Sequence, residues 1–526
     1  MKKILLAAMV MGMVLPVAAQ DTYESGRLLG SDLNGTARYV GMGGAMDALG
    51  ADISTMSSNP AGIGLFRHST VSATVGLVSQ QGASKFDGLS PTNMSFDQLG
   101  FVYSSRVSRK SFINFGANYH KSRNFDQILS AANRLNGASS NGLTYNKAER
   151  RYASSGGFDL GFYKQSDEAV GFESPTSDLR AYTYTQMDDL NANVLMLDTK
   201  DDVFYTAEGE KYTFDRAHRG WIADFDLNIS GNHNDRVYWG FTVGIHSVKY
   251  KGYSEYSEWL VSTNGQSIGG VSFGDERKIT GTGYDVKAGL IFRPIEESPF
   301  RIGLAVSTPT WYELTSENNT AMVNQSDMGR WNDGDTKESY KFQYTTPWKF
   351  GVSLGHTVGT SVAIGAGYEY SDYGASKNKI IDGYYAYDVA QSSVDGQMKH
   401  NTEQVMKGVH TLKAGVEIKP DPTVAIRLGY NYVSAAYNKE GERDMTLDTP
   451  GVMYASTSDY TNWKDTHRFT FGLGYKAGPM NIDLAYQYNA MNGDFHPMQN
   501  YGGYAPSVTS VSNKRHQVLL TLGYTF

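Results

Sequence analysis

Hydrophobic and polar residues alternate with a period of two over most of the chain after residue 69. Apolar side chains occupy every second position from Tyr284 to Phe292, and the same alternation recurs from Val424 to Tyr432 and in the final segment that ends at Phe526. This period is typical of β-strands, because successive side chains point to opposite faces. Fourteen strands are predicted, at residues 69–79, 97–106, 111–121, 220–231, 236–250, 284–293, 299–309, 346–358, 361–373, 409–419, 424–432, 466–477, 480–490 and 517–526.

The connections between these strands alternate between short and long. Tight turns such as Gly359-Thr360 and Gly478-Pro479 follow one end of the strands. Short turns on one side and long loops on the other are the plan of an outer-membrane barrel. The predicted long loops cover residues 80–96, 122–219, 251–279, 310–345, 374–408, 436–465 and 491–514.

The chemistry of the two strand faces indicates which face meets lipid. One parity carries mainly apolar residues, whereas the other carries Lys287, Glu417, Arg427 and further charged residues. A basic residue facing lipid costs about 2–4 kcal/mol near the bilayer midplane, so the apolar parity faces outward. Periodicity alone leaves a soluble barrel open, but fourteen strands enclose a lumen too wide for side chains to fill. We therefore predict an all-β fold, a 14-stranded antiparallel transmembrane β-barrel formed by residues 69–526.

The first nineteen residues predict export. Lys2 and Lys3 precede a short apolar run from Ile4 to Leu15, and small residues end at Ala19. This is the pattern of a secretory signal peptide, 1–19, cleaved after Ala19. Together with the barrel it predicts that the protein lies in the outer membrane of a Gram-negative bacterium, with lipid and the barrel assembly machinery as partners.

Composition and charge exclude several functions. The chain contains no cysteine, so disulfides and thiolate chemistry are excluded, and its net charge of -7 offers no basic surface for nucleic acid. Gly351 to Gly355 matches the G-x-S-x-G nucleophile pattern, but strand alternation continues through it where an exposed turn is needed. We expect no enzymatic activity, no cofactor, no metal site and a monomer.

Residues 20–68 lie before the first strand and lack a clear period. Gly41, Gly43 and Gly44 permit close packing and positive φ, and Asn59-Pro60 favours a turn. Because an empty lumen of this width leaks small solutes, we predict that this segment folds into the barrel as an N-terminal hatch. The alternative is a disordered N-terminal tail.

Several stretches resemble the FadL/TodX family of outer-membrane transporters of hydrophobic compounds. The first is Arg38 to Ala51 followed by SNPAGIGLF (Ser58 to Phe66), which is similar to the family's hatch with its Asn-Pro-Ala signature. Thr346 to Gly374 and His410 to Ser434 resemble two of its strand pairs, and the chain ends in an aromatic residue. The resemblance covers nearly all of the predicted mature chain.

The resemblance implies passive transport of hydrophobic small molecules, fatty acid-like or aromatic. Ligand enters from the extracellular loops, and it leaves sideways into the bilayer at a kinked strand when the hatch rearranges. An alternative within the same fold is a non-transporting barrel that docks protein partners in a secretion system. The residues assigned to the hatch and its gating are Arg38, Gly41, Gly43, Gly44, Asp52, Asn59, Pro60 and Ala61.

Some strand positions that are predicted to face the lumen carry apolar residues, although most lumen-facing positions are polar or glycine. An apolar pocket for the ligand is one interpretation, and packing against the hatch is the other. These pocket candidates are Val78, Val102, Phe112, Tyr238, Ile291 and Leu519. Within the long loop 122–219, Asp178 to Leu197 is predicted to form a helix over the barrel mouth.

Overall fold

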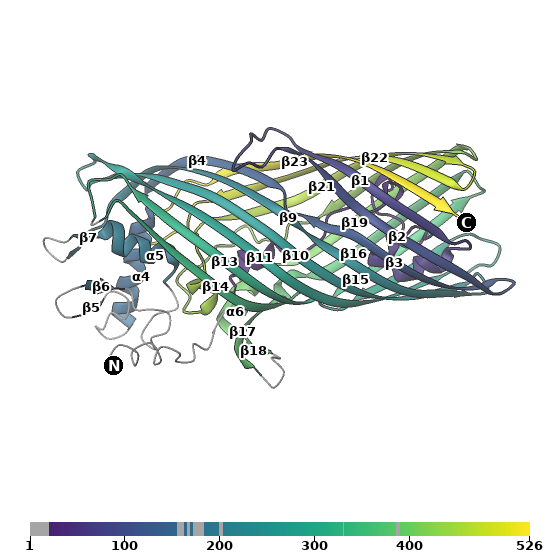
Figure 1. Cartoon of the computed structure of the whole chain (residues 1–526), viewed down its shortest axis with the longest axis horizontal. Helices are drawn as coiled ribbons and strands as arrows, with labels where there is room; N and C mark the ends of the chain where they lie inside the picture. The colour runs from purple at the N-terminus through teal and green to yellow at the C-terminus, as the bar shows by residue number, and fades with distance from the viewer. Residues whose placement is uncertain are drawn as a thin grey trace, which may run out of the picture.

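The protein forms a closed antiparallel β-barrel with fourteen strand positions in its wall (Figure 1). Each position is called a stave, because some of them are interrupted and carry two strand labels. The computed structural model describes residues 20–154, 163–165, 169–171, 184–198, 203–329, 331–384 and 390–526. The barrel closes where β1 pairs along its length with β23, from Thr70 opposite Thr525 to Gln80 opposite Arg515. The prediction of a 14-stranded barrel is therefore confirmed.

Three staves are interrupted and carry two strand labels each, while a fourth ends in a hairpin that leaves the wall. The fourteen staves are β1 (Thr70–Gln80), β2 (Thr92–Ser108), β3 with β4 (Ser111–Asn124, Gln127–Gly137), β9 (Glu208–His233), β10 (Val237–Val261), β11 (Ser267–Phe292), β12 with β13 (Arg301–Ser307, Trp311–Asn324), β14 with β15 (Asp333–Thr345, Lys349–Val358), β16 (Val362–Asp372), β19 (Gly408–Asp421), β20 (Val424–Val433), β21 (Tyr460–Ala477), β22 (Met480–His496) and β23 (Thr509–Thr525). The hairpin consists of β17 (Lys377–Tyr384) and β18 (Ala390–Val394), and the short pairs β5 (Tyr163–Gln165) with β6 (Ala169–Gly171) and β7 (Leu197–Asp198) with β8 (Val203–Phe204) lie outside the barrel sheet.

The barrel exterior carries a continuous apolar belt near the end with the short turns. Phe241, Val286, Phe350, Leu473 and Leu522, from five different staves, are all exposed although apolar. Such a surface is stable against lipid and not against water. The belt therefore identifies a transmembrane barrel, with its short turns on the periplasmic side.

Three hairpins repeat one aromatic arrangement at the upper edge of this belt. A Tyr-x-Tyr sequence on one strand faces a histidine on the next, and the first tyrosine hydroxyl lies 2.8 Å from His Nδ1 in each case. Amphipathic rings of this kind suit the boundary between lipid tails and headgroups. The three pairs are Tyr368–His410, Tyr430–His467 and Tyr486–His516.

The staves from β9 to β14 continue far beyond the belt and form a tall extracellular wall (Figure 1). On β10, Phe241 and Ile245 are exposed, but from Lys249 onward the outward residues are mainly polar, while Tyr250 and Tyr256 are buried inside. The wall thus turns polar residues outward and apolar residues inward, the reverse of the membrane part. This is expected for strands that face water outside and a packed core inside.

This inversion overturns part of the loop prediction. Residues 251–279 and 310–345 are largely strand, and residues 208–219 of the predicted loop 122–219 belong to β9. The prediction was wrong there because it followed only the lipid-facing phase, which ends where the strand leaves the membrane. No helix in the described part of the chain is long and apolar enough to span a membrane.

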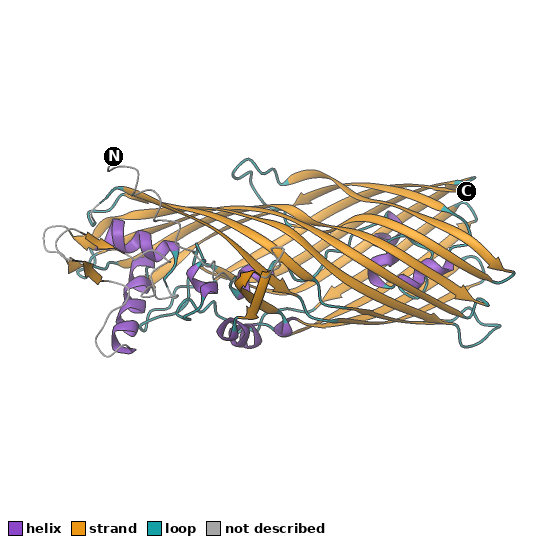
Figure 2. Ribbon diagram, turned by 60° about the horizontal axis from the view of Figure 1, so that its bottom comes forward, coloured by secondary structure: helices purple, strands orange, loops and turns teal. Residues whose placement is uncertain are grey.

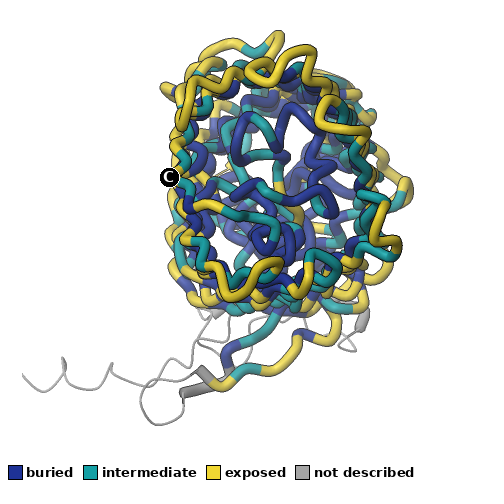
Figure 3. The backbone as a smooth tube through the Cα atoms, turned by 90° about the vertical axis from the view of Figure 1, so that its right-hand side faces the viewer, coloured by how far each residue is buried: buried dark blue, intermediate teal, exposed yellow. Residues whose placement is uncertain are grey.

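Residues 20–66 lie inside the barrel. Figure 3, which looks into the end with the short turns, shows buried chain within the ring of wall strands. Nearly all residues from Ala37 to Gly64 are buried. The short helices of this N-terminal segment are α1 (Thr22–Gly26), α2 (Ala37–Gly41), α3 (Thr55–Ser58) and η1 (Pro60–Leu65).

The extracellular end is covered by loop structure packed on the inner face of the wall (Figure 2). Leu143, Leu190 and Leu195 form one apolar cluster with Phe214 and Phe273 of the wall. The predicted helix at 178–197 is helical from residue 186 to residue 196, while 178–183 lie outside the described residues. The helices at this end and beside it are α4 (Ser140–Ser154), α5 (Gln186–Leu190), η2 (Asn191–Met196), η3 (Tyr373–Ala375), α6 (Gly396–Val405) and α7 (Pro450–Met453).

Candidate functional site

The Asn-Pro-Ala triplet lies at the inner wall of the periplasmic half. Asn59 is fully buried, its Nδ2 donates to the carbonyl oxygen of Asp47 at 2.9 Å, and its Oδ1 accepts from the backbone N–H of Ala61 at 3.2 Å. Asn59 therefore caps η1, and Pro60 occupies the first position of that helix, where its missing N–H costs nothing. The triplet fixes how the N-terminal segment turns toward the wall.

Glycines of the wall give the N-terminal segment its place. A Cβ added at Gly289 would overlap Asn59 Oδ1 and lie 2.9 Å from the backbone nitrogen of Ala61, and one at Gly365 would overlap the carbonyl oxygen of Ala45. Segment and wall touch through their backbones here, which only glycine allows. Five further wall glycines are in similar contact with the segment, namely Gly240, Gly355, Gly415, Gly429 and Gly472.

Substitution of one such glycine is expected to loosen the segment. Gly289→Ala should destabilise the folded barrel by about 1–3 kcal/mol, because overpacking forces the segment away from the wall. We expect a lower heat-unfolding temperature of the purified barrel and higher sensitivity of cells to a large antibiotic. The matched control is Gly351→Ala, since an added Cβ there finds its nearest atom at 3.6 Å. Equal behaviour of the two variants would contradict the prediction.

Ion pairs fix the lower part of the segment. Arg38 Nε lies 3.1 Å from Glu417, and Arg427 bonds both Glu417 at 2.7 Å and Asp483 at 2.6 Å. Arg38 also donates to the carbonyl oxygen of Ala51 at 2.9 Å. This series of four charged side chains connects the segment to β19, β20 and β22.

The other predicted hatch residues shape the turns of the segment. Asp52 accepts hydrogen bonds from the Thr36 hydroxyl at 2.8 Å and from the backbone N–H of Ser54 at 3.0 Å. Gly43 and Gly44 have φ of 62° and 77°, values that favour glycine. Gly41 lies with its Cα close to Gly472, so a Cβ there would be 3.1 Å from the Gly472 Cα. Whether these residues gate the lumen stays a prediction.

The upper end of the segment is held by a buried charge cluster. Glu24 in α1 lies 2.8 Å from Arg27 and 2.6 Å from Arg277, while Arg443 lies 2.7 Å from Asp21. Burial alone would raise the pKa of Glu24, but the charges of Arg27, Arg277 and Arg443 outweigh it and lower this pKa to about 2. The segment therefore depends on an ionised Glu24.

Acidification is expected to weaken this attachment. Because the folded-state pKa of Glu24 lies near 2 against an ordinary 4.5, its stabilising effect is complete above about pH 5 and disappears as the pH falls toward 2, a loss of roughly 3 kcal/mol. Heat unfolding followed over this range should show the loss in the native protein. Glu24→Gln should be less stable at neutral pH and lack this part of the pH dependence, whereas the exposed Glu255→Gln should keep it.

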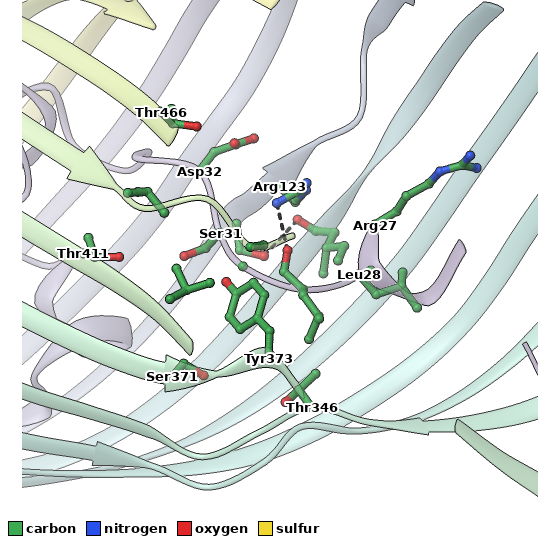
Figure 4. Close-up of a pocket in the computed structure, with 18 of the residues that line it drawn as sticks. Arg27, Leu28, Ser31, Asp32, Arg123, Thr346, Ser371, Tyr373, Thr411 and Thr466 are labelled. Carbon is green, nitrogen blue, oxygen red and sulfur yellow. Dashed lines mark hydrogen bonds between the residues drawn. The ribbon is translucent and has the colours of Figure 1, made fainter. Parts of the chain in front are cut away.

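A cavity of about 360 Å³ lies between the N-terminal segment and the inner wall (Figure 4). Leu28, Ser31 and Asp32 line it from the segment, and Arg123 and Tyr373 line it from the wall. Arg123 donates to the carbonyl oxygen of Leu29 at 2.9 Å, which ties the segment to the cavity rim. The lining combines aromatic rings with many charged groups.

A buried ionic network forms one side of this cavity. His246 lies 2.7 Å from Asp224 and 3.2 Å from Asp285, and Lys287 lies 3.0 Å from Asp285 and 3.1 Å from Asp226. Among the described residues, no group of three or more His, Cys, Asp or Glu side chains is placed so that it could hold a metal ion. Sequence reasoning missed this network, although the shared lumen-facing parity of its members was a signal that could have found it.

The wall has a seam beside the cavity. Pairing of β2 with β3 ends at Gln98 and His120, above which β2 pairs only with β1, and β3 and β4 pair only with β9. The stave breaks at Phe125 and Asp126, between β3 and β4. In the described strand pairing, the edges of β2 and β3 just above Gln98 and His120 therefore face each other without a ladder, while β4 lies beside the end of β1 and the start of β23.

Side chains bridge this seam. Asn34 donates to Asp97 Oδ1 and to the carbonyl oxygen of Lys121, both at 2.9 Å. Higher up, where β4 lies beside the end of β1, the side-chain amide of Gln80 in β1 donates to the carbonyl oxygen of Ile128 at 2.6 Å and accepts from its N–H at 2.8 Å. One amide thus replaces a strand partner, and Asn34 of the N-terminal segment closes the lower part.

None of the six pocket candidates is among the residues that line the cavity. Val102 packs with Ile53, Met56 and Ile63, while Leu519 packs with Val40 and its neighbours. Their role in ligand binding stays a prediction. The remaining positions are Tyr238 and Ile291 against Ala61, Phe112 beneath the Arg67 guanidinium at 4.6 Å, and Val78, which is half-buried.

The fold and its occupied lumen define a class of protein, the fourteen-stranded outer-membrane barrels whose interior holds their own N-terminal segment. Among solved structures, the chain is similar to the toluene transporter TodX of P. putida, at 11% identity and a TM-score of 0.47 over 94% of this chain and 99% of that one. It is also similar to a FadL homologue of Pseudomonas aeruginosa, at 12% identity and a TM-score of 0.49 over 97% and 99% of the two chains.

A third similar structure is the toluene transporter TbuX of Ralstonia pickettii, at 12% identity and a TM-score of 0.45 over 94% of this chain and 99% of that one. No family model and no curated protein matches the chain. These three structures are of the type that the sequence resemblance indicated. The architecture itself follows from the strand pairing of this chain.

Proposed function

We propose that the protein is a passive route for hydrophobic small molecules across the outer membrane, in which the N-terminal segment is a hatch. The observation that carries the proposal is the position of Asn34, a residue of the segment that bridges Asp97 and Lys121 at the seam. A movement of the segment that releases Asn34 opens the wall beside the cavity. Closure of the lumen and closure of the wall are therefore coupled.

The direction of exit follows from solvation. An apolar ligand gains free energy when it passes from the cavity into lipid, and it gains nothing by entering the aqueous periplasm. Outside the seam, Phe96 and Tyr119 stack at 5.8 Å, so the opening faces an apolar surface. Lateral exit through the seam is the path that this arrangement favours.

The character of the cavity favours a ligand that is not wholly apolar. Three cations lie around Asp32, and burial, which alone would raise the pKa of this carboxyl, is outweighed by their charges, so its pKa is lowered. A fatty acid-like molecule would find both aromatic rings and cations there, whereas an aromatic hydrocarbon would use the rings alone. The three cations are Arg515, Arg123 and Arg468.

The proposal is tested by uptake into cells that lack other routes for apolar compounds. Cells making the native protein should accumulate a labelled long-chain fatty acid or a labelled monoaromatic hydrocarbon faster than cells making Asp32→Arg together with Arg123→Glu, which leaves the belt intact. The same purified barrel should carry a small lipid detectable by mass spectrometry. An empty lumen, unchanged uptake and a stoichiometric protein partner would instead support the partner-docking alternative.

A further inference from the structure

Two lysines flank one outward tryptophan where the extracellular wall rises from the apolar belt. Lys121 Nζ lies 5.7 Å and Lys249 Nζ lies 5.6 Å from the ring centroid of Trp221. The three residues come from the neighbouring strands β3, β9 and β10, and Lys249 stands two outward positions beyond the lipid-facing Ile245. An indole is typical of the boundary between lipid tails and headgroups. Both ammonium groups therefore lie at the depth of the extracellular headgroups.

The protein leaves the charge of these two lysines largely unmatched. Within the described part of the chain, neither ammonium group has a carboxylate within ion-pair distance. Lys121 acts on the carboxylate of Asp126, but this carboxylate is shared with Arg515 and a further arginine. The indole attracts each ammonium weakly and does not cancel its charge. An anion supplied from outside the chain would complete the patch formed by Lys121, Trp221 and Lys249.

The next row of the wall, farther from the membrane, is neutralised by the protein itself. Lys251 faces Arg219 on one side and Lys278 on the other, an arrangement of like charges that is unfavourable unless they are matched. Each of these three cations has its own carboxylate. The pairs are Arg219–Asp87 at 2.7 Å, Lys251–Glu276 at 2.5 Å and Lys278–Glu317 at 3.0 Å. Carboxylates thus accompany the cations that face water, and they are missing from the described row at headgroup depth.

We propose that the patch of Lys121, Trp221 and Lys249 binds a phosphate group on the sugar headgroup of an outer-leaflet glycolipid. The two ammonium groups donate to phosphate oxygens, and the C–H face of the sugar packs on the indole. The acyl chains of the same molecule lie along the belt beside Ile245. The short turns place this boundary on the extracellular side, so the lipid comes from the outer leaflet. The inference is independent of transport, because it concerns only the outside of the wall.

Titration of the purified, delipidated full-length barrel with bisphosphorylated lipid A tests the proposal, with native mass spectrometry as the readout. Removal of both phosphates from the probe should lower its affinity about thirtyfold, since each lysine near an anionic lipid surface contributes roughly fivefold. Higher salt should reduce the affinity for the phosphorylated probe alone. Equal binding of the two probes would overturn the proposal, and so would equally tight binding of phosphatidylglycerol.

A pair of double variants locates the site. Lys121→Gln with Lys249→Gln should lower the affinity for bisphosphorylated lipid A about thirtyfold. The matched control is Lys110→Gln with Lys476→Gln, which removes the same charge from exposed lysines at the end with the short turns and should bind as the native protein does. Heat-modifiable migration reports whether each variant is folded, and the comparison of probes on the native protein does not depend on it. Native affinity in the first variant, or an equal loss in the control, would contradict the assignment.

Discussion

Deletion of residues 20–64 is expected to turn the barrel into an open pore. The segment provides most of the buried chain in the periplasmic half of the lumen, and a barrel of fourteen strands is too wide for wall side chains to close. Single-channel recordings of the deletion variant should show a large, steady conductance that the native protein lacks. Cells that produce it should become sensitive to vancomycin, which the intact outer membrane excludes.

Two controls make this result interpretable. The deletion variant must retain heat-modifiable migration, which reports a folded barrel, because loss of the segment exposes Arg427 and Asp483 in the lumen. Conductance should fall again when a peptide covering the deleted residues is supplied during refolding. A folded deletion variant with native conductance would show that the N-terminal segment does not close the lumen.

The membrane part of this fold was predictable because lipid imposes a strict pattern. Each outward residue on the lower part of β10, such as Phe241 or Ile245, must be apolar, so the alternation is visible in the sequence. Above the membrane the same strand turns polar residues such as Lys249 outward and Tyr250 inward. Water tolerates both polar and apolar residues at the strand surface, so the alternation weakens there, and the sequence predicts loops where the extracellular wall lies.

The site was less predictable than the fold because its contacts join distant parts of the chain. The Asn59-Pro60-Ala61 triplet stands out locally, but nothing near Gly289 indicates that its missing side chain makes room for that triplet. Asn34 matches no pattern, and its importance appears only when Asp97 and Lys121 are brought together. A period reports which face a residue occupies, but it does not report what the residue meets across the lumen.

Removal of the Asn34 side chain is expected to open the seam without opening the lumen. Asn34→Ala loses two hydrogen bonds across the seam, worth about 2 kcal/mol together, which corresponds to a roughly thirtyfold rise in the population of the open seam. The rest of the segment keeps its glycine contacts and its ion pairs. Uptake of a labelled apolar probe should therefore rise, while vancomycin should still be excluded.

Faster uptake with vancomycin still excluded would separate two roles of the N-terminal segment, closing the seam and closing the lumen, which the deletion of residues 20–64 removes together. The matched control is Asn93→Ala, which removes an asparagine of β2, the strand of Asp97, whose amide donates to the carbonyl oxygen of Ser90 in the adjoining turn. Faster uptake by Asn34→Ala alone would locate the exit at the seam, since only that variant changes the contact between β2 and β3. If uptake is unchanged while the deletion variant leaks, the segment closes the lumen but the ligand leaves by another path. If Asn34→Ala admits vancomycin as the deletion variant does, Asn34 holds the whole segment and has no separate role at the wall.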